Sequence, residues 1–360
     1  MNILTRRDLG RLFAGTVAAL PFILQHNPAL ADQPTVDEAL IALVDPELRA
    51  IARQMLANST KTGPLTGASL ATLRSGVEQW IKPPLPGVTV EQRAVAVRGG
   101  PDVPVHVINA RPGSGRPAIL HTHGGGYVLG TPRIDIPKLQ ALAQTLDCVI
   151  VTVDYRLAPE TRWPGSIEDT YGALKWLHDH AQDLGVDPHR IAVMGESAGG
   201  GHAAILAIVA RDRGEVPVMF QCLIYPMLDD RTGSTRAVAS PAGQIGWTAP
   251  DNRFGWRSFL GQEPGTPDAP VLPVPARVAT VKGLPPAYIA VGALDLFLDE
   301  DIAYAQRLAD AGIATELQVI PGAFHGFDEI GAGTAISARF QAAKIEALRR
   351  AFASAAGPRV

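Results

Sequence analysis

Short apolar runs alternate with longer amphipathic segments over most of the chain. The longer segments repeat their apolar positions every three to four residues, as helices do, whereas the runs have the length of buried strands. The runs predict strands at 118–121, 148–153, 191–194, 218–224, 287–291 and 315–320, and the segments predict helices at 136–146, 167–180, 197–211, 300–311 and 335–352. Strands that alternate with helices indicate an α/β fold, with a mostly parallel sheet covered by helices on both faces.

Two regions depart from this alternation. The region 32–82 has helical spacing but precedes the first strand, and residues 229–282 are too many for an ordinary loop and are rich in Pro, Gly and Trp. The alternating patterns at 88–97 and 103–108 predict a β-hairpin, which brings the sheet to eight strands. We therefore expect N-terminal helices over 32–82 and one α/β domain over 83–360, with an insertion at about 229–282 that would form a lid.

The first 31 residues have the pattern of an export signal. Arginines at positions 6 and 7 precede an apolar run at 13–24, which is too short to span a bilayer, and Ala29-Leu30-Ala31 provides a small-x-small cleavage pattern. The segment resembles a twin-arginine signal, and it predicts a periplasmic or secreted protein that begins near Asp32. The alternative is an uncleaved amphipathic helix on a cytoplasmic protein.

Composition narrows the class of partner. The 360 residues are 46% hydrophobic and 19% charged, enough for one large core, and the net charge of −3 comes without a long basic run. Nucleic acid is therefore an unexpected partner. Cys148 and Cys222 each lie in a separate apolar run, which favours buried thiols over a disulfide. Since metal-ligand spacings are missing from the sequence, we predict no metal and no cofactor.

The motif Gly195-Glu196-Ser197-Ala198-Gly199 stands between an apolar run and a helical segment. A serine on such a sharp turn from strand to helix presents its hydroxyl away from the sheet, and the flanking glycines avoid collisions with neighbouring backbone. Ser197 is therefore the candidate nucleophile.

An acylating serine needs a base, a group that orients the base, and donors for the oxyanion. In α/β-hydrolase sheets the chain order is serine, acid, histidine. Only His202 and His325 follow Ser197, and His202 leaves no room for an intervening strand, so His325 is the predicted base. Asp295, which follows the strand at 287–291, is the predicted acid, and Asp229 is the alternative.

The donors are expected from a glycine-rich stretch after the third strand. His123, Gly124, Gly125 and Gly126 stand there, and successive glycines let backbone N–H groups approach a tetrahedral intermediate. The N–H of Ala198 completes the predicted oxyanion hole.

These motifs together resemble the bacterial hormone-sensitive-lipase-like esterases of the α/β-hydrolase fold. The resemblance runs from about residue 44 to about residue 327, and it includes the stretches 123–127, 153–160, 195–200, 283–286 and 325–327. It implies a helical cap above the sheet, Ser197, Asp295 and His325 as nucleophile, acid and base, and Gly125, Gly126 and Ala198 as oxyanion donors. Glu196 stands where the family more often has Asp, and Leu296 stands where it usually has Pro.

The sequence thus predicts a serine carboxylesterase that acts on short-chain acyl or aryl esters through an acyl-enzyme. Its partner is a small-molecule ester, a stable membrane span is not expected, and a homodimer is compatible with the sequence. An amidase, lactonase or peptidase would use the same residues. A non-catalytic binding module could keep the pocket, but it would have no physical need to retain Ser197, Asp295 and His325 together.

Overall fold

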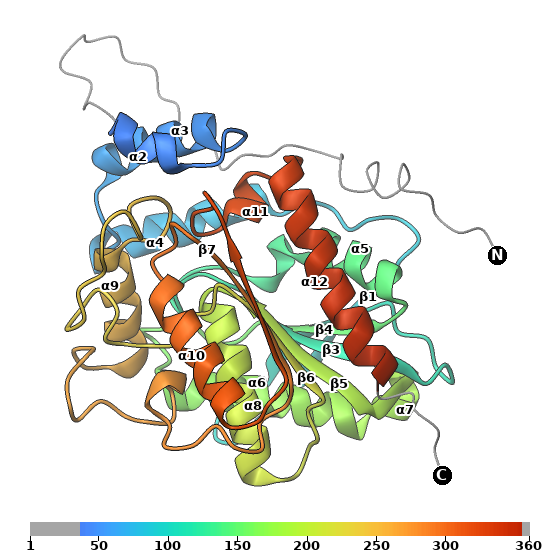
Figure 1. Cartoon of the computed structure of the whole chain (residues 1–360). Helices are drawn as coiled ribbons and strands as arrows, with labels where there is room; N and C mark the ends of the chain where they lie inside the picture. Colours follow the sequence, from blue (N-terminus) through green and yellow to red (C-terminus); the bar gives the residue numbers. More distant parts are fainter. Residues whose placement is uncertain (1–36, 355–360) are drawn as a thin grey trace.

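A single eight-stranded sheet organises the computed structural model, which describes residues 37–354 (Figure 1). The strand order is β1-β2-β4-β3-β5-β6-β7-β8; β1 and β4 both pair antiparallel with β2, and all other neighbours are parallel. The strands are β1 (Val90–Val95), β2 (Val103–Ile108), β3 (Arg116–Thr122), β4 (Val149–Val153), β5 (Val186–Glu196), β6 (Phe220–Ile224), β7 (Ala287–Gly292) and β8 (Thr315–Ile320). The predicted α/β-hydrolase architecture, with its opening hairpin and eight strands, is confirmed.

Helices cover both faces of this sheet. The α-helices are α2 (Glu38–Leu43), α3 (Arg49–Thr62), α4 (Gly67–Gly76), α5 (Ile136–Leu146), α6 (Trp163–Asp179), α7 (Ala181–Leu184), α8 (Ala198–Arg213), α9 (Ala249–Leu260), α10 (Leu298–Asp310), α11 (Phe327–Ile330) and α12 (Ala335–Ser354). Short 3-10 turns add η1 (Val77–Trp80), η2 (Pro132–Ile134) and η3 (Pro275–Arg277).

The two faces bury two separate apolar clusters. Successive residues of β3 show the alternation, because Leu120 packs with α6, α8 and α10 on one face, whereas Ile119 packs with α5 and α12 on the other. The polar sequence that opens β5 hides the first part of this strand from a hydrophobic pattern, so β5 begins at Val186, before the predicted start at residue 191.

The two regions that departed from the alternation contact each other. The backbone N–H of Leu65, just before α4, donates to Asp251 Oδ1 at the start of α9 at 2.7 Å. Figure 1 shows α2 and α3 above one end of the sheet and α9 beside α4. The end of α2 also reaches the segment that follows β8, since Asp45 N donates to Gly322 O at 3.0 Å.

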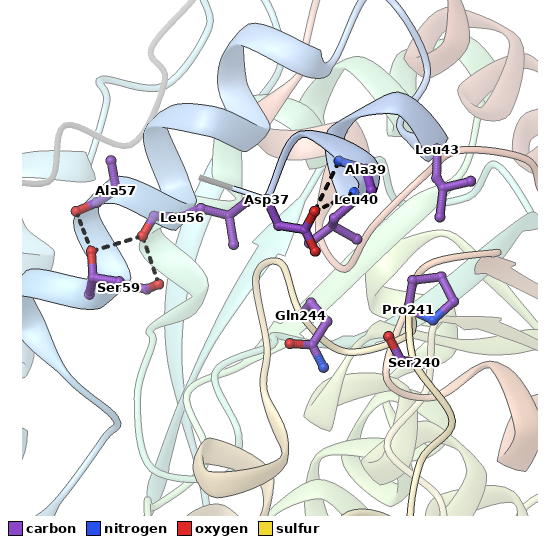
Figure 2. A pocket seen from close by; sticks show the side chains of 11 residues that line it. Asp37, Ala39, Leu40, Leu43, Leu56, Ala57, Ser59, Ser240, Pro241 and Gln244 are labelled. Carbon is purple, nitrogen blue, oxygen red and sulfur yellow. Dashed lines mark hydrogen bonds between the residues drawn. The ribbon is translucent and has the colours of Figure 1, made fainter. Parts of the chain in front are cut away.

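A cleft of about 410 Å³ separates α2 and α3 from the loop 240–244 (Figure 2). Its wall is mostly apolar, with Leu40, Leu43 and Leu56 on the helices opposite Pro241 and Gln244 of the loop.

Between residues 37 and 354, no helix has the length and apolar character needed to cross a membrane. The predicted export signal lies outside the described residues.

Candidate active site

Ser197 occupies the turn between β5 and α8. Its backbone has φ 58° and ψ −124°, a conformation that non-glycine residues rarely adopt and that is typically retained at functional sites. The neighbouring backbone leaves no room for side chains: a Cβ at Gly195 would lie 2.3 Å from Gly199 O, and a Cβ at Gly199 would lie 2.0 Å from Thr122 O. The turn therefore requires the two glycines that flank the serine.

The fold brings Ser197, His325 and Asp295 together from three distant segments. His325 Nε2 lies 2.8 Å from Ser197 Oγ, and His325 Nδ1 lies 2.9 Å from Asp295 Oδ2 and 3.1 Å from Oδ1. Since a carboxylate only accepts, Nδ1 carries the proton and Nε2 is free to accept from the serine hydroxyl. All three side chains are buried. This arrangement can remove a proton from Ser197 while Asp295 orients the imidazole.

The alternative acid, Asp229, is paired with other groups. Its carboxylate accepts from Arg231 Nε at 2.8 Å and from Arg236 Nη1 at 3.0 Å. Burial alone would raise the pKa of Asp229, but the hydrogen bonds from Arg231 and the charges of Arg231 and Arg236 together outweigh burial and lower it. The geometry therefore associates Asp295, and not Asp229, with His325.

Two aromatic rings that sequence reasoning did not identify hold the His325 ring. Tyr225 and Phe297 meet it edge-on, with ring centroids 4.8 Å and 5.2 Å away. The Tyr225 hydroxyl donates to Asp328 Oδ1 at 2.8 Å, and burial raises the pKa of Asp328 to about 6. Tyr225 directly follows β6, and this position at the carboxyl edge of the sheet is the signal that could have identified it.

The glycine-rich loop after β3 lies against the nucleophile turn. A Cβ at Gly124 would stand 3.1 Å from Glu196 O and 3.5 Å from Ser197 Cβ. Gly125 and Gly126 have φ 123° and 60°, which bulkier residues rarely adopt. Ala198 opens α8, where backbone N–H groups have no partner within the helix. The predicted donors thus border the serine from two sides.

The side chain of His123 stabilises the glycine-rich loop. Its Nδ1 donates to Gly124 O at 2.8 Å, and its ring stacks on Tyr155 with centroids 4.3 Å apart. Burial lowers the pKa of His123 to about 4, so the ring is neutral at pH 7. His202 is also buried, among Tyr127 and Tyr155, and burial lowers its pKa to about 3. Both histidines are packing groups.

The segment that follows β4 braces the site through ion pairs. Arg156 Nη2 contacts Asp169 at 2.6 Å. Arg74 of α4 binds Glu160 at 2.8 Å and also donates to the carbonyl oxygen of Val128, two residues after the glycine-rich loop, at 2.8 Å. An N-terminal helix is thereby fixed to the loop that carries the predicted oxyanion donors.

Trp247, which lies between β6 and α9, packs against Gly126, one of the candidate donors. A Cβ at Gly126 would lie 2.2 Å from the Trp247 ring, and a Cβ at Gly246 would lie 2.8 Å from His325 O. Trp256 and Phe259, which belong to α9, are fully buried beside Tyr127. Their apolar area is used in the core because the helix α9 packs one face inward.

Comparison with known proteins agrees with the fold and the motifs. A family model described as alpha/beta hydrolase fold matches residues 119–329. The chain is 34% identical over 291 residues to carboxylesterase NlhH of Mycobacterium tuberculosis, with 77% of this chain and 88% of that protein covered. It is 33% identical over 252 residues to ethyl acetate hydrolase of Pseudomonas putida, with coverages of 67% and 76%.

Solved structures give the same relationship. A bacterial heroin esterase superposes with a TM-score of 0.78 at 36% identity, covering 87% of this chain and 99% of its own. Esterase LipW of Mycobacterium marinum has a TM-score of 0.75 at 35% identity, with coverages of 87% and 97%. The chain therefore belongs to the alpha/beta-hydrolase fold family, among the hormone-sensitive-lipase-like bacterial carboxylesterases that its sequence resembles, and it is a carboxylic ester hydrolase.

Proposed function

We propose that the protein is a serine carboxylesterase that hydrolyses short-chain acyl or aryl esters through an acyl-enzyme on Ser197. The observation that carries the proposal is the 2.8 Å contact between His325 Nε2 and Ser197 Oγ, with Asp295 on the opposite side of the imidazole. In the first half-reaction Ser197 Oγ attacks the ester carbonyl and His325 takes its proton. His325 then gives this proton to the leaving alcohol, and the acyl group stays on Ser197.

The backbone N–H groups of Gly125, Gly126 and Ala198 act as the oxyanion hole. Each donor of this kind stabilises the tetrahedral intermediate by about 3 kcal/mol. This assignment is supported by the close approach of the glycine-rich loop to the turn that carries Ser197. A Cβ placed on Gly124 would lie only 3.1 Å from Glu196 O. In the second half-reaction water attacks the acyl-enzyme, His325 again takes the proton, and the carboxylic acid leaves as Ser197 is reprotonated.

The substrate range follows from the cap, which we assign to residues 32–82 together with the insertion at about 229–282 of the catalytic domain 83–360. We place Trp247, which lies against Gly126, at the wall that limits the depth available to the acyl chain. Each buried methylene adds about 0.8 kcal/mol until the pocket is filled, after which further carbons gain nothing. Acyl chains of roughly two to eight carbons suit a closed pocket of ordinary size. The similarity to an ethyl acetate hydrolase supports a small ester.

A series of p-nitrophenyl esters from acetate to palmitate tests this proposal. We expect kcat/KM to be greatest between two and eight carbons, with Ser197→Ala as the blank. A maximum at palmitate together with activation at an emulsion surface would overturn the substrate range, and activity that persists in the blank would overturn the mechanism.

We further propose export through the N-terminal residues 1–31, to the periplasm or the medium, on the pattern of paired arginines, apolar run and Ala29-Leu30-Ala31. The mature chain then begins near Asp32. Mass spectrometry of protein from the native host decides this, since an intact N-terminus in cytosolic material would refute it.

A further inference from the structure

A cluster of charged side chains lies next to the turn that carries Ser197, on the face of the sheet covered by α5 and α12. Glu196 immediately precedes Ser197, and its side chain is only 6% exposed. It accepts from His121 Nε2 of β3 at 2.8 Å, while the other ring nitrogen of His121 lies 2.9 Å from Thr152 Oγ1 of β4. Glu196 is thus anchored across three neighbouring strands.

Lys138 of α5 connects this anchored residue to the segment that carries the base. Its ammonium lies 3.9 Å from Glu196 Oε1 and 3.0 Å from Asp135 Oδ1, and it also binds Glu329 of α11. The helix α11 begins two residues after His325. One ammonium therefore joins three carboxylates, one of them adjacent to the nucleophile and another four residues after the base.

The charges in this cluster support one another. Burial alone would lower the pKa of Lys138, but Asp135, Glu196 and Glu329 outweigh burial and hold it well above its ordinary value. Burial alone would raise the pKa of Glu196, but Lys138 and His121 hold it below its ordinary value. The ammonium and the Glu196 carboxylate therefore both stay ionised at neutral pH.

We propose that Lys138 is a positioning residue for the esterase reaction, because it ties the Ser197 turn to α11 and so fixes the separation between nucleophile and base. The inference rests on the proposed roles of Ser197 and His325. Neither residue contacts Lys138 directly, so the effect acts through Glu196 and Glu329. A displacement of about 1 Å in reacting groups can cost about a hundredfold in rate, and a partial loosening of these two segments should cost about tenfold.

Diethyl p-nitrophenyl phosphate separates positioning from folding. Ser197 Oγ attacks its phosphorus, p-nitrophenolate leaves, and His325 accepts the serine proton. The amount of p-nitrophenolate released counts the competent sites, and the rate constant reports how well serine and base are aligned. For Lys138→Met we expect a rate constant about tenfold lower at an unchanged amount per folded protein, and Lys138→Arg should restore most of the rate.

The exposed pair Lys175–Asp179 on α6, 2.9 Å apart, provides the matched control. Lys175→Met should phosphorylate at the wild-type rate. If Lys138→Met does not fold, Glu329→Ala decides the question, because Glu329 is 46% exposed and its loss removes only the link to α11. A several-fold slower reaction of Glu329→Ala supports the proposal.

Two results would overturn the positioning role of Lys138. One is a wild-type rate constant in folded Lys138→Met, and the other is a wild-type rate constant in Glu329→Ala. A wild-type protein that is inert to the reagent would instead refute the proposed role of Ser197, and the Lys138 proposal would fall with it.

Discussion

The substitution Gly125→Ala tests the predicted oxyanion hole with a single methyl group. Gly125 has φ 123°, and a Cβ there would lie 2.1 Å from the carbonyl oxygen of Leu129 and 3.2 Å from Gly130 N. Both contacts are with backbone, so a side chain cannot rotate away to relieve them. The loop that carries the Gly125 and Gly126 donors must therefore move by about 1 Å.

The size of the effect follows from this displacement. Misplacement by about 1 Å costs on the order of a hundredfold in rate, and complete loss of one donor costs about 3 kcal/mol, or between a hundredfold and a thousandfold in kcat. We expect Gly125→Ala to lower kcat by a factor in this range. KM should change little, because the oxyanion exists only after the ester has been attacked.

Gly115→Ala is the matched control for backbone strain. Gly115 also has a positive φ, 57°, but among the described residues no atom outside Gly115 and its two chain neighbours lies within 4 Å of the position that its Cβ would take. Forcing alanine into this region costs about 1 kcal/mol, which lowers Tm by about 2 °C in a chain of this size and leaves kcat unchanged. Steady-state hydrolysis of p-nitrophenyl butyrate and thermal melts measure both. Equal kcat values for the two variants would refute the assignment of the loop as oxyanion hole.

Four further substitutions test other parts of the molecule. Asp295→Asn should lower kcat by roughly 10⁴, whereas Asp229→Asn should lower Tm and leave kcat within a few-fold; the reverse result would make Asp229 the acid. Burial raises the pKa of the Glu300 carboxyl from 4.5 to about 8. Between these two pH values the carboxyl is deprotonated in the unfolded chain but still protonated in the folded protein, so the free energy of unfolding falls as pH rises through this interval. Glu300→Gln should therefore raise Tm relative to wild type at pH 9 but not at pH 4, and an equal change at both pH values would contradict the shift. Trp247→Ala should move the acyl preference toward longer chains, and an unchanged chain-length profile would remove Trp247 from the pocket wall.

Local patterns in the sequence made the fold predictable, and they also pointed to Ser197, His325 and Asp295, which the structure brings together. The strand runs stood out because both faces of a parallel strand are buried, and the turn around Ser197 needs glycines that are visible in sequence. His325 and Asp295 followed from the chain order of this fold and from their places after strands.

Side-chain partners that lie far apart in the sequence were not predictable. Lys138 meets Glu329, 191 residues away, and a lysine on an amphipathic helix gives no sign of such a partner. The aromatic residues of α9 were also ambiguous, because apolar spacing fits the core and the pocket wall equally well. Packing buries Trp256 and Phe259, whereas Trp247 lies before the helix and reaches Gly126.

The hydrolysis rate of Ser197→Ala tests the central claim most directly. Removing the nucleophile of a triad costs about 10⁶ in kcat, so we predict a loss of this size for p-nitrophenyl butyrate with the fold retained. Ser166→Ala, in which another buried serine is changed on α6, is the matched control and should keep wild-type kcat. A Ser197→Ala protein that retains more than about a tenth of wild-type kcat would contradict the account, because acyl transfer through Ser197 could not then be the route of hydrolysis.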